Sequence, residues 1–193
     1  MYRIIRLAKI SFYLTLLFYS ITVNCEENLD FKNYSLNILL STQNNFTIKN
    51  IEEDKIIKGT FLGKIENLSN KKFNNSIIEC DVLGHSYKGR GFSCGFAEVE
   101  DLNGYCKIKF QEKKNIMLID WRCKTTAGMM GDAVCKGKLN ILKGFGEYAG
   151  VIGFGKIEMP LIKSIIGNGK ASFPMKLQLS LKQAIQLRTQ LNN

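Results

Sequence analysis

Residues 144–155, GFGEYAGVIGFG, decide the fold class because they hold five of the seventeen glycines of the chain. Glycine at this density opposes a helix, and the Phe, Tyr, Val and Ile residues between the glycines suit a turn that leads into a strand. In such a segment the missing Cβ atoms permit a positive φ or a close approach of a neighbouring backbone. The stretch therefore predicts an all-β protein, either a barrel or a sandwich.

Short apolar or alternating runs, separated by turns rich in Asn, Asp, Gly and Lys, continue this pattern along the chain. The clearest run is 173–181, where apolar residues alternate with polar or small ones, as in a half-buried strand. Short connections favour an antiparallel meander that closes on itself and so removes its exposed edges. We predict a single domain at 26–181, an antiparallel closed barrel of about eight strands, followed by a short C-terminal helix or tail at 182–193.

The N-terminus has the layout of a secretory signal peptide. Three basic residues precede an apolar run at 10–23, and the first acidic residue is Glu26. Such a run is typical of a signal peptide and is short for a membrane span, which needs roughly 20 residues. We place cleavage after Cys25, so that 1–25 is removed and the product is periplasmic or secreted. An uncleaved anchor is the alternative.

The expected mature chain is basic. Removing 1–25 takes away three basic residues and no acidic one, which leaves 24 Lys and Arg against 17 Asp and Glu, a net charge of +7. The lysines alternate with apolar residues, as is typical of a solvated strand face that deters edge aggregation. The charge is also compatible with an anionic membrane surface as a partner. Nucleic acid is not expected, because the cations form no single run and the chain is exported.

Five cysteines remain after the expected cleavage, and export favours disulfides between them. Their separations of 12 to 17 residues match none of the close pairs of a structural zinc site, and His85 is the only histidine, so we expect no metal. We predict two bridges among Cys94, Cys106, Cys123 and Cys135, with Cys80 free or paired elsewhere.

The pairing of these cysteines depends on where the hairpins turn. A turn at 101–104, between strands expected at 89–99 and 105–111, brings Cys94 near Cys106. A turn at 113–115 brings Cys106 opposite Cys123, and a turn at 128–131 brings Cys123 near Cys135. The sequence leaves the connectivity open.

Four residues are candidates for ligand binding. Tyr148 lies between glycines and can stack on a ligand, although a tyrosine there also suits covering the bare backbone of a neighbouring strand. Met129 and Met130, in the loop TAGMMGD, can line a mouth that accepts apolar ligands. Trp121, the only tryptophan, is assigned either to the same site or to the core.

The sequence indicates no catalytic constellation and no cofactor. Residues 144–149 fit the letter of a dinucleotide-binding fingerprint, but the glycines that follow at once prevent the helix that this motif requires. His85 and Ser86 are adjacent, and adjacent residues on a strand point to opposite faces. The catalytic residues, if any, stay unknown.

From Cys94 to Lys156 the order of motifs resembles the small exported β-barrels of the allene oxide cyclase-like, or calycin-like, group. The resemblance consists of Cys94, an acidic turn at 101–104, Trp121-Arg122-Cys123, Cys135-Lys136-Gly137 and the glycine pattern of 144–155. It implies an eight-stranded antiparallel barrel with an apolar interior open at one end. No residue here aligns with the catalytic carboxylate of the plant cyclases, so catalysis is not carried over.

Two functions follow as expectations. The first is a non-catalytic exported barrel that binds a small apolar or amphipathic molecule or a protein partner. The second, its alternative, is an allene oxide cyclase-like isomerase that acts on an oxidised fatty acid. An enzyme would place a buried carboxylate or histidine of shifted pKa in the cavity, whereas a binding protein would have an apolar or filled interior.

Overall fold

The computed structural model describes residues 31–41, 45–67, 71–90, 95–127, 133–168 and 171–180. The expected signal peptide at 1–25, the expected tail at 182–193, Cys94, Met129 and Met130 lie outside these residues. The elements, in chain order, are β1 (Lys32–Leu40), β2 (Asn45–Ile51), β3 (Asp54–Glu66), β4 (Ile77–Arg90), β5 (Phe96–Lys109), β6 (Ile116–Ala127), β7 (Ala133–Phe145), the 3-10 turn η2 (Gly146–Tyr148), β8 (Ile152–Pro160), α2 (Ile162–Asn168) and β9 (Ser172–Ser180).

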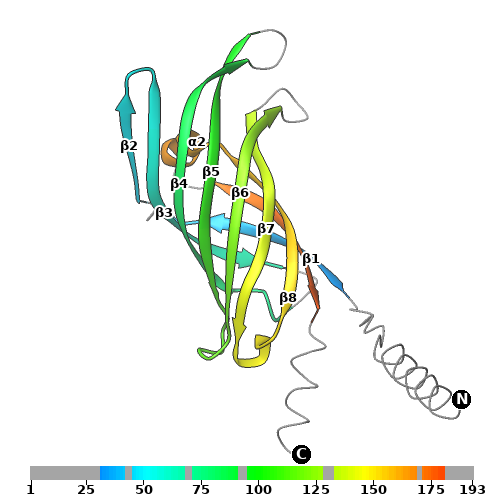
Figure 1. Ribbon diagram of the computed structural model, residues 1–193. Helices are drawn as coiled ribbons and strands as arrows, with labels where there is room; N and C mark the ends of the chain where they lie inside the picture. Colours follow the sequence, from blue (N-terminus) through cyan, green and yellow to red (C-terminus); the bar gives the residue numbers. More distant parts are fainter. Residues whose placement is uncertain are drawn as a thin grey trace, which may run out of the picture.

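The strands form one antiparallel sheet that closes in a ring (Figure 1). Their order is β1-β9-β8-β7-β6-β5-β4-β3-β2, and β1 also pairs with β3, through 37–40 against 63–66. β2 lies outside the ring and pairs with the first part of β3, at 54–60. The prediction of an all-β, antiparallel chain is confirmed, with nine strands in the sheet.

Alternating burial explains why these residues form strands. In β9, Phe173, Met175, Leu177 and Leu179 are buried, while the residues between them face outward over most of the strand. The inward side chains of the ring form one continuous apolar cluster. The Phe61 ring belongs to this cluster, and its centroid lies 5.9 Å from that of Phe173 and 6.3 Å from that of Trp121.

The glycine stretch is a turn between two strands, as predicted. β7 ends at Phe145, η2 follows, and β8 begins at Ile152. Gly146 has a φ of +67° and Gly150 a φ of +76°, a backbone conformation that L side chains rarely adopt. At Gly146 a Cβ would also collide with the Asn115 side chain and the Lys114 backbone, so glycine allows the neighbouring turn to approach.

The predicted turn at 101–104 is wrong. β5 runs without interruption from Phe96 to Lys109, and the connection to β4 falls between Arg90 and Phe96. Asp101 and Asn103 belong to the outer face of this strand, and Gly104 faces inward opposite Trp121. A Cβ on Gly104 would clash with the backbone of Asp81 and approach the indole nitrogen to 3.0 Å, so the glycine makes room within a strand.

The continuity of β5 also explains which cysteines form disulfides. Because β5 is continuous, Cys106 lies directly opposite Cys80 in β4 and bonds to it. Cys123 bonds to Cys135 across the β6–β7 hairpin. The sequence predicts both bridges among Cys94, Cys106, Cys123 and Cys135. This is wrong for one of the two bridges, because Cys80, and not Cys94, joins the bonded set. The two bridges are compatible with an oxidising compartment.

Both prolines of the chain mark the place where the ring opens. The β8–β9 ladder stops at Ile157 and Met175, Pro160 ends β8, and Pro174 follows the last pair on β9. Proline has no N–H to donate, so it suits a position where the ladder is interrupted. Between the two strands α2 turns inward, and its Ile162 and Ile165 are buried in the core.

The two disulfides should contribute unequally to the stability of the fold. Both close buried pairs between neighbouring strands, but Cys80–Cys106 encloses a separation of 26 residues and Cys123–Cys135 one of 12. Under the chain-entropy account, each contributes about 2–4 kcal/mol to the free energy of unfolding, and the longer loop about 0.7 kcal/mol more. Urea unfolding should therefore show a larger loss for C80A/C106A than for C123A/C135A. A larger loss for the second pair would contradict this reading.

Candidate functional site

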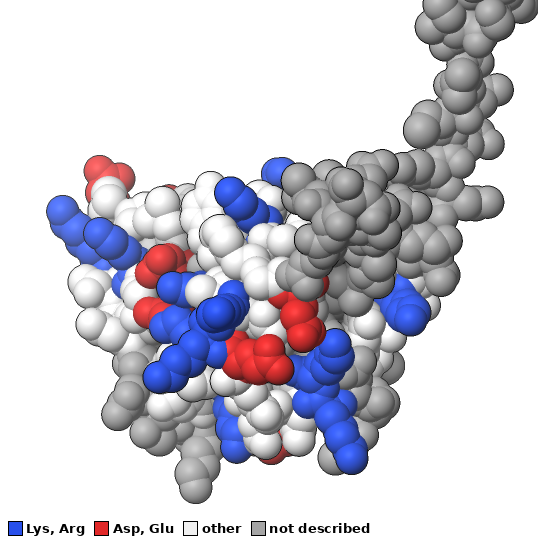
Figure 2. All heavy atoms as spheres, turned by 90° about the horizontal axis from the view of Figure 1, so that it is seen from below, with Lys and Arg blue, Asp and Glu red and all other residues white. Residues whose placement is uncertain are grey.

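Three turns meet at the closed end of the ring. In an antiparallel meander every second connection returns to the same end. Residues 71–76 belong to the connection between β3 and β4, residues 110–115 join β5 to β6, and η2 belongs to the connection between β7 and β8. Figure 2 views the molecule from this end and shows acidic and basic side chains side by side. The sheet topology thus gathers polar turn residues that are far apart in the sequence.

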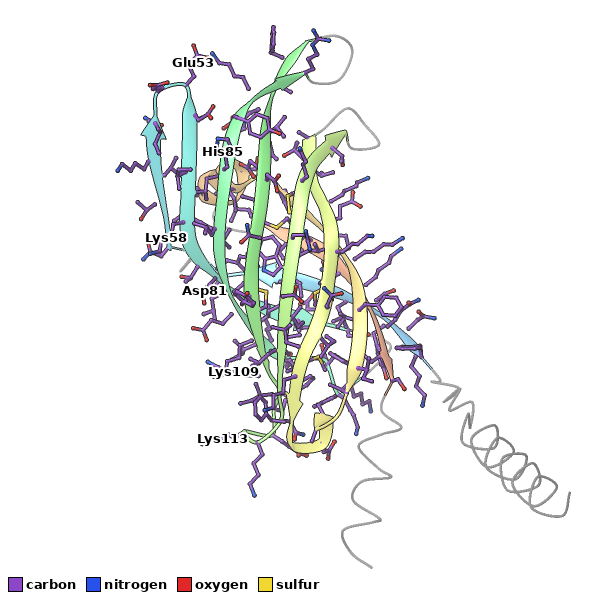
Figure 3. All side chains as sticks on the ribbon, in the orientation of Figure 1. Glu53, Lys58, Asp81, His85, Lys109 and Lys113 are labelled. Atoms are coloured by element: carbon purple, nitrogen blue, oxygen red, sulfur yellow. A yellow bond between two sulfur atoms is a disulfide. The ribbon has the colours of Figure 1, made fainter. Side chains whose placement is uncertain are left out.

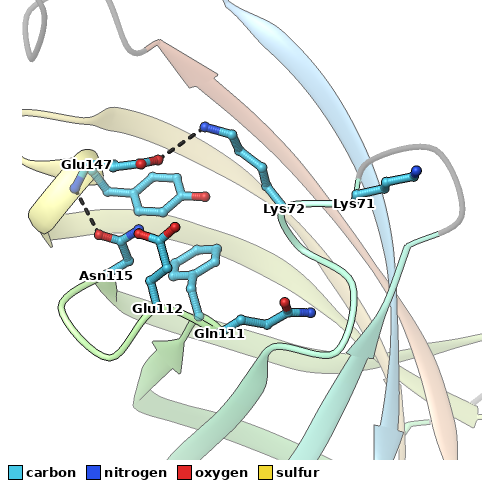
Figure 4. Close-up of a pocket in the computed structure, with 8 residues that line it drawn as sticks. Lys71, Lys72, Gln111, Glu112, Asn115 and Glu147 are labelled. Carbon is cyan, nitrogen blue, oxygen red and sulfur yellow. Dashed lines mark hydrogen bonds and ion pairs between the residues drawn. The ribbon is translucent and has the colours of Figure 1, made fainter.

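These turns enclose a pocket of about 260 Å³ that we call the end pocket (Figure 4). Its floor is aromatic, because the rings of Phe110 and Tyr148 stack with centroids 4.1 Å apart and Phe73 packs edge-on against Phe110 at 5.4 Å. The residues that line it are Lys71, Lys72, Phe110, Gln111, Glu112, Asn115, Glu147 and Tyr148.

Hydrogen bonds hold the polar rim of the end pocket in place. The Lys72 ammonium lies 3.1 Å from the Glu147 carboxylate, across the mouth (Figure 4). The Asn115 side chain joins two turns, since its Oδ1 accepts from the Glu147 N–H at 3.0 Å and its Nδ2 donates to Glu112 at 3.2 Å. Burial, together with the nearby Glu147 charge, raises the pKa of Tyr148, so this phenol stays neutral and can offer a hydrogen bond.

The structure places the ligand-binding residues that we proposed from the sequence in different parts of the molecule. Tyr148 lies in the end pocket, where it also belongs to the core cluster. Trp121 is a core residue, 3% exposed, and does not line the end pocket. Met129 and Met130 lie outside the described residues. Sequence reasoning missed Phe110 and Lys72, which only the turn topology brings to Tyr148, and it also missed Glu147, the neighbour of Tyr148 in η2.

A second polar cluster lies inside the opened end of the ring and holds α2. Glu98 accepts hydrogen bonds from Lys55 and Lys163, each at 2.9 Å, and from Ser86 at 2.9 Å. Two steps along β5, Glu100 receives the backbone N–H of Ile162 on both carboxylate oxygens, at 2.9 and 3.1 Å. The two carboxylates thus fix the first residues of α2 to the inner wall of β5.

The two carboxylates have pKa values shifted in opposite directions. The hydrogen bonds from Lys163 and Lys55 lower the pKa of Glu98 to about 2. Glu100 is 1% exposed, and burial raises its pKa, with the Glu98 charge adding to the rise and the Ile162 hydrogen bond opposing it. Glu100 is therefore the described carboxyl whose burial favours the protonated form, and its oxygens already have a structural partner.

His85 belongs to neither cluster. Its Nε2 lies 2.8 Å from Asp54, and its ring stacks on Tyr87 at 5.0 Å. Figure 3 shows His85 on the upper part of β4, whereas Lys113 projects from the opposite end of the molecule. Within the described ranges, no three His, Cys, Asp or Glu side chains are grouped so as to bind a metal ion.

Comparison with protein-family models, with curated proteins and with solved structures found no match. Among the described residues, no helix has the length and apolar character needed to cross a membrane.

Glu98 should make the protein sensitive to acid. Its folded pKa lies below the ordinary value of 4.5, so its ion pairs stabilise the fold above that pH and are lost as the pH falls from about 4.5 to about 2. Between pH 6 and pH 3 the free energy of unfolding should therefore fall less in E98Q than in the unaltered chain. The difference between the two falls should be about 1 kcal/mol or less. E53Q, which removes an exposed pair with Lys88 at 3.8 Å, is the matched control. Identical pH profiles for E98Q and the unaltered chain would contradict the assignment.

Glu100 should behave in the opposite way. Because its pKa is raised in the folded chain, the ionised form of Glu100 opposes folding. Its contribution to the free energy of unfolding therefore falls as the pH rises through the pKa that it has in the folded chain. Gln at this position keeps an acceptor for Ile162 without the charge, whereas Ala leaves a buried N–H unpaired at about 1–3 kcal/mol. Urea unfolding at pH 7 should rank E100Q above E100A in stability. Equal stability of the two variants would show that Glu100 does not hold α2.

Proposed function

We propose that the chain is an exported, closed β-barrel that binds a small amphipathic molecule without reacting with it. The observation that carries this proposal is the end pocket, where a stacked aromatic floor lies beneath a charged and amide-lined rim. An apolar portion of a ligand fits against Phe110 and Tyr148, and its polar groups face Lys72, Gln111 and Glu112. A volume of about 260 Å³ suits one small molecule.

The interior of the ring supports binding rather than catalysis. Inward side chains form a continuous apolar cluster, and the one strongly buried described carboxylate, Glu100, is occupied by the α2 backbone. The end pocket holds Glu112 and Glu147, but Asn115 and Lys72 hydrogen-bond to them. The two disulfides and the basic N-terminal segment followed by an apolar run support export.

An isomerase acting on an oxidised fatty acid is the alternative, and the raised pKa of Glu100 favours it. Its test is incubation with an oxidised fatty acid and analysis of the products. If the unaltered chain converts the fatty acid and E100Q does not, the isomerase replaces the binding proposal. If the fatty acid stays unchanged, the binding proposal is supported.

Native mass spectrometry of the chain after incubation with a lipid extract tests the binding role. We expect a reproducible adduct that Y148A weakens about tenfold, because one aromatic contact is worth roughly 1.4 kcal/mol. Y148F keeps the stacked ring and should retain the adduct. A chain that emerges without any bound molecule would contradict the proposal.

The matched control is Y105A, which removes a tyrosine that is exposed on the outer wall. It should retain the adduct. Because Tyr148 is also buried, K72A provides a second variant whose side chain is exposed and whose loss should weaken the adduct without disturbing the core. Equal weakening by Y105A and K72A would show that the adduct is not in the end pocket.

A further inference from the structure

Four cationic side chains lie in one row on the outer wall of the ring. The sheet register places Arg122 of β6 opposite Lys138 of β7, Lys138 opposite Lys156 of β8, and Lys156 opposite Lys176 of β9. All four are exposed. We call these four residues the basic row. With strands about 4.8 Å apart, the backbone positions of the row span roughly 14 Å. β6, β7 and β8 lie side by side on the near side of Figure 1.

The basic row works against the stability of the sheet. Like charges directly opposite each other on neighbouring strands repel. In the next row along the strands, Lys136 also lies opposite a lysine, Lys124, but its ammonium is 3.4 Å from the Glu158 carboxylate. No member of the basic row forms an ion pair with any residue that the structure describes. An external anionic partner would relieve this repulsion.

Apolar side chains are exposed beside the row. On β8, Phe154 and Ile152 share the outer face with Lys156, and they are 47% and 42% exposed. Leu142 of β7 is also exposed, at 54%. Cations next to exposed Phe, Ile and Leu are typical of surfaces that lie on a bilayer, with the charges at the headgroups and the apolar groups below them. The Phe154 ring also packs on Phe31, with centroids 5.5 Å apart, and stays 47% exposed. A linear polyanion would account for the cations and leave the exposed area of these apolar side chains unexplained.

We propose that the outer wall around β7 and β8 docks on an anionic phospholipid surface. The basic row contacts the lipid phosphates, and Phe154 and Ile152 reach the boundary of the acyl chains. This surface is separate from the end pocket and goes beyond the proposed function, because its residues lie on the strands and not in the turns that line that pocket.

Vesicle sedimentation of the full chain tests the proposal. We expect binding to vesicles of phosphatidylcholine with 30% phosphatidylglycerol, weaker binding at higher salt, and much weaker binding to phosphatidylcholine alone, as follows from attraction to an anionic surface. Removing the row in R122Q/K138Q/K156Q/K176Q should reduce partitioning onto the anionic vesicles by at least about tenfold.

A second quadruple variant is the matched control. K49Q/K58Q/K64Q/K107Q removes the same charge from exposed lysines on other strands, and it should bind within about twofold of the unaltered chain. Both variants share the same N-terminal segment, so any membrane affinity of that segment affects both equally. Equal loss of binding in the two variants would overturn the proposal, since net charge would then be sufficient.

Two further measurements exclude other causes. Thermal unfolding of the row variant should occur at the same or a higher temperature, because repulsion is removed, so loss of binding is not loss of fold. F154S, with the row intact, should weaken vesicle binding and leave binding to inorganic polyphosphate unchanged. Binding to polyphosphate or to a single-stranded oligonucleotide without binding to vesicles would overturn the proposal in favour of a linear polyanion. Y105A, the control used for the end pocket, should bind vesicles as the unaltered chain does, and the row variant should retain the adduct in the end pocket, which separates the two tests.

Discussion

The double pairing of β1 is the constraint on which the rest of the structure depends. β1 forms a ladder with β9 from Lys32 to Leu39, and its last four residues, 37–40, also pair with β3. Without this second, short contact, β1 and part of β3 would be exposed edges, and the inward faces of the strands would meet water. Closure converts a simple alternation of apolar and polar residues into an interior and an exterior. The filled interior and the charged wall are two results of the same closure.

The two ends of the ring use polar groups differently. At the closed end, three turns converge, aromatic rings seal the interior, and Asn115 ties one turn to another. At the other end, β8 and β9 separate, and α2 fills the connection with Glu98 and Glu100 as its anchors. The buried acid thus serves the architecture, while the surface available to a small molecule lies at the opposite end. This division is why we propose a binding role and not chemistry within the ring.

Much of the fold was accessible from the sequence, because burial on one face imposes a period of two that can be read directly, as in β9. The glycine stretch was equally informative, since Gly146 and Gly150 need a positive φ. The turn expected at 101–104 was wrong because the composition of these residues suits a turn, whereas their packing against Trp121 stabilises a strand. α2 went unpredicted because it is seven residues long and is anchored by a carboxylate 62 positions earlier in the chain. For the same reason Phe110 and Lys72 could not be assigned to Tyr148, since only the topology brings them together.

The position of β2 limits how copies of the protein can join. Among the described strands, β2 has an outer edge that is unpaired along its full length, with Lys49 near its middle and Ile48 and Ile51 exposed. If two copies met antiparallel along this edge, each would consume the free backbone donors and acceptors of the other. None of the other described strands has a comparable full-length edge to recruit a third copy, so pairing along β2 ends with two copies and does not extend into a fibre.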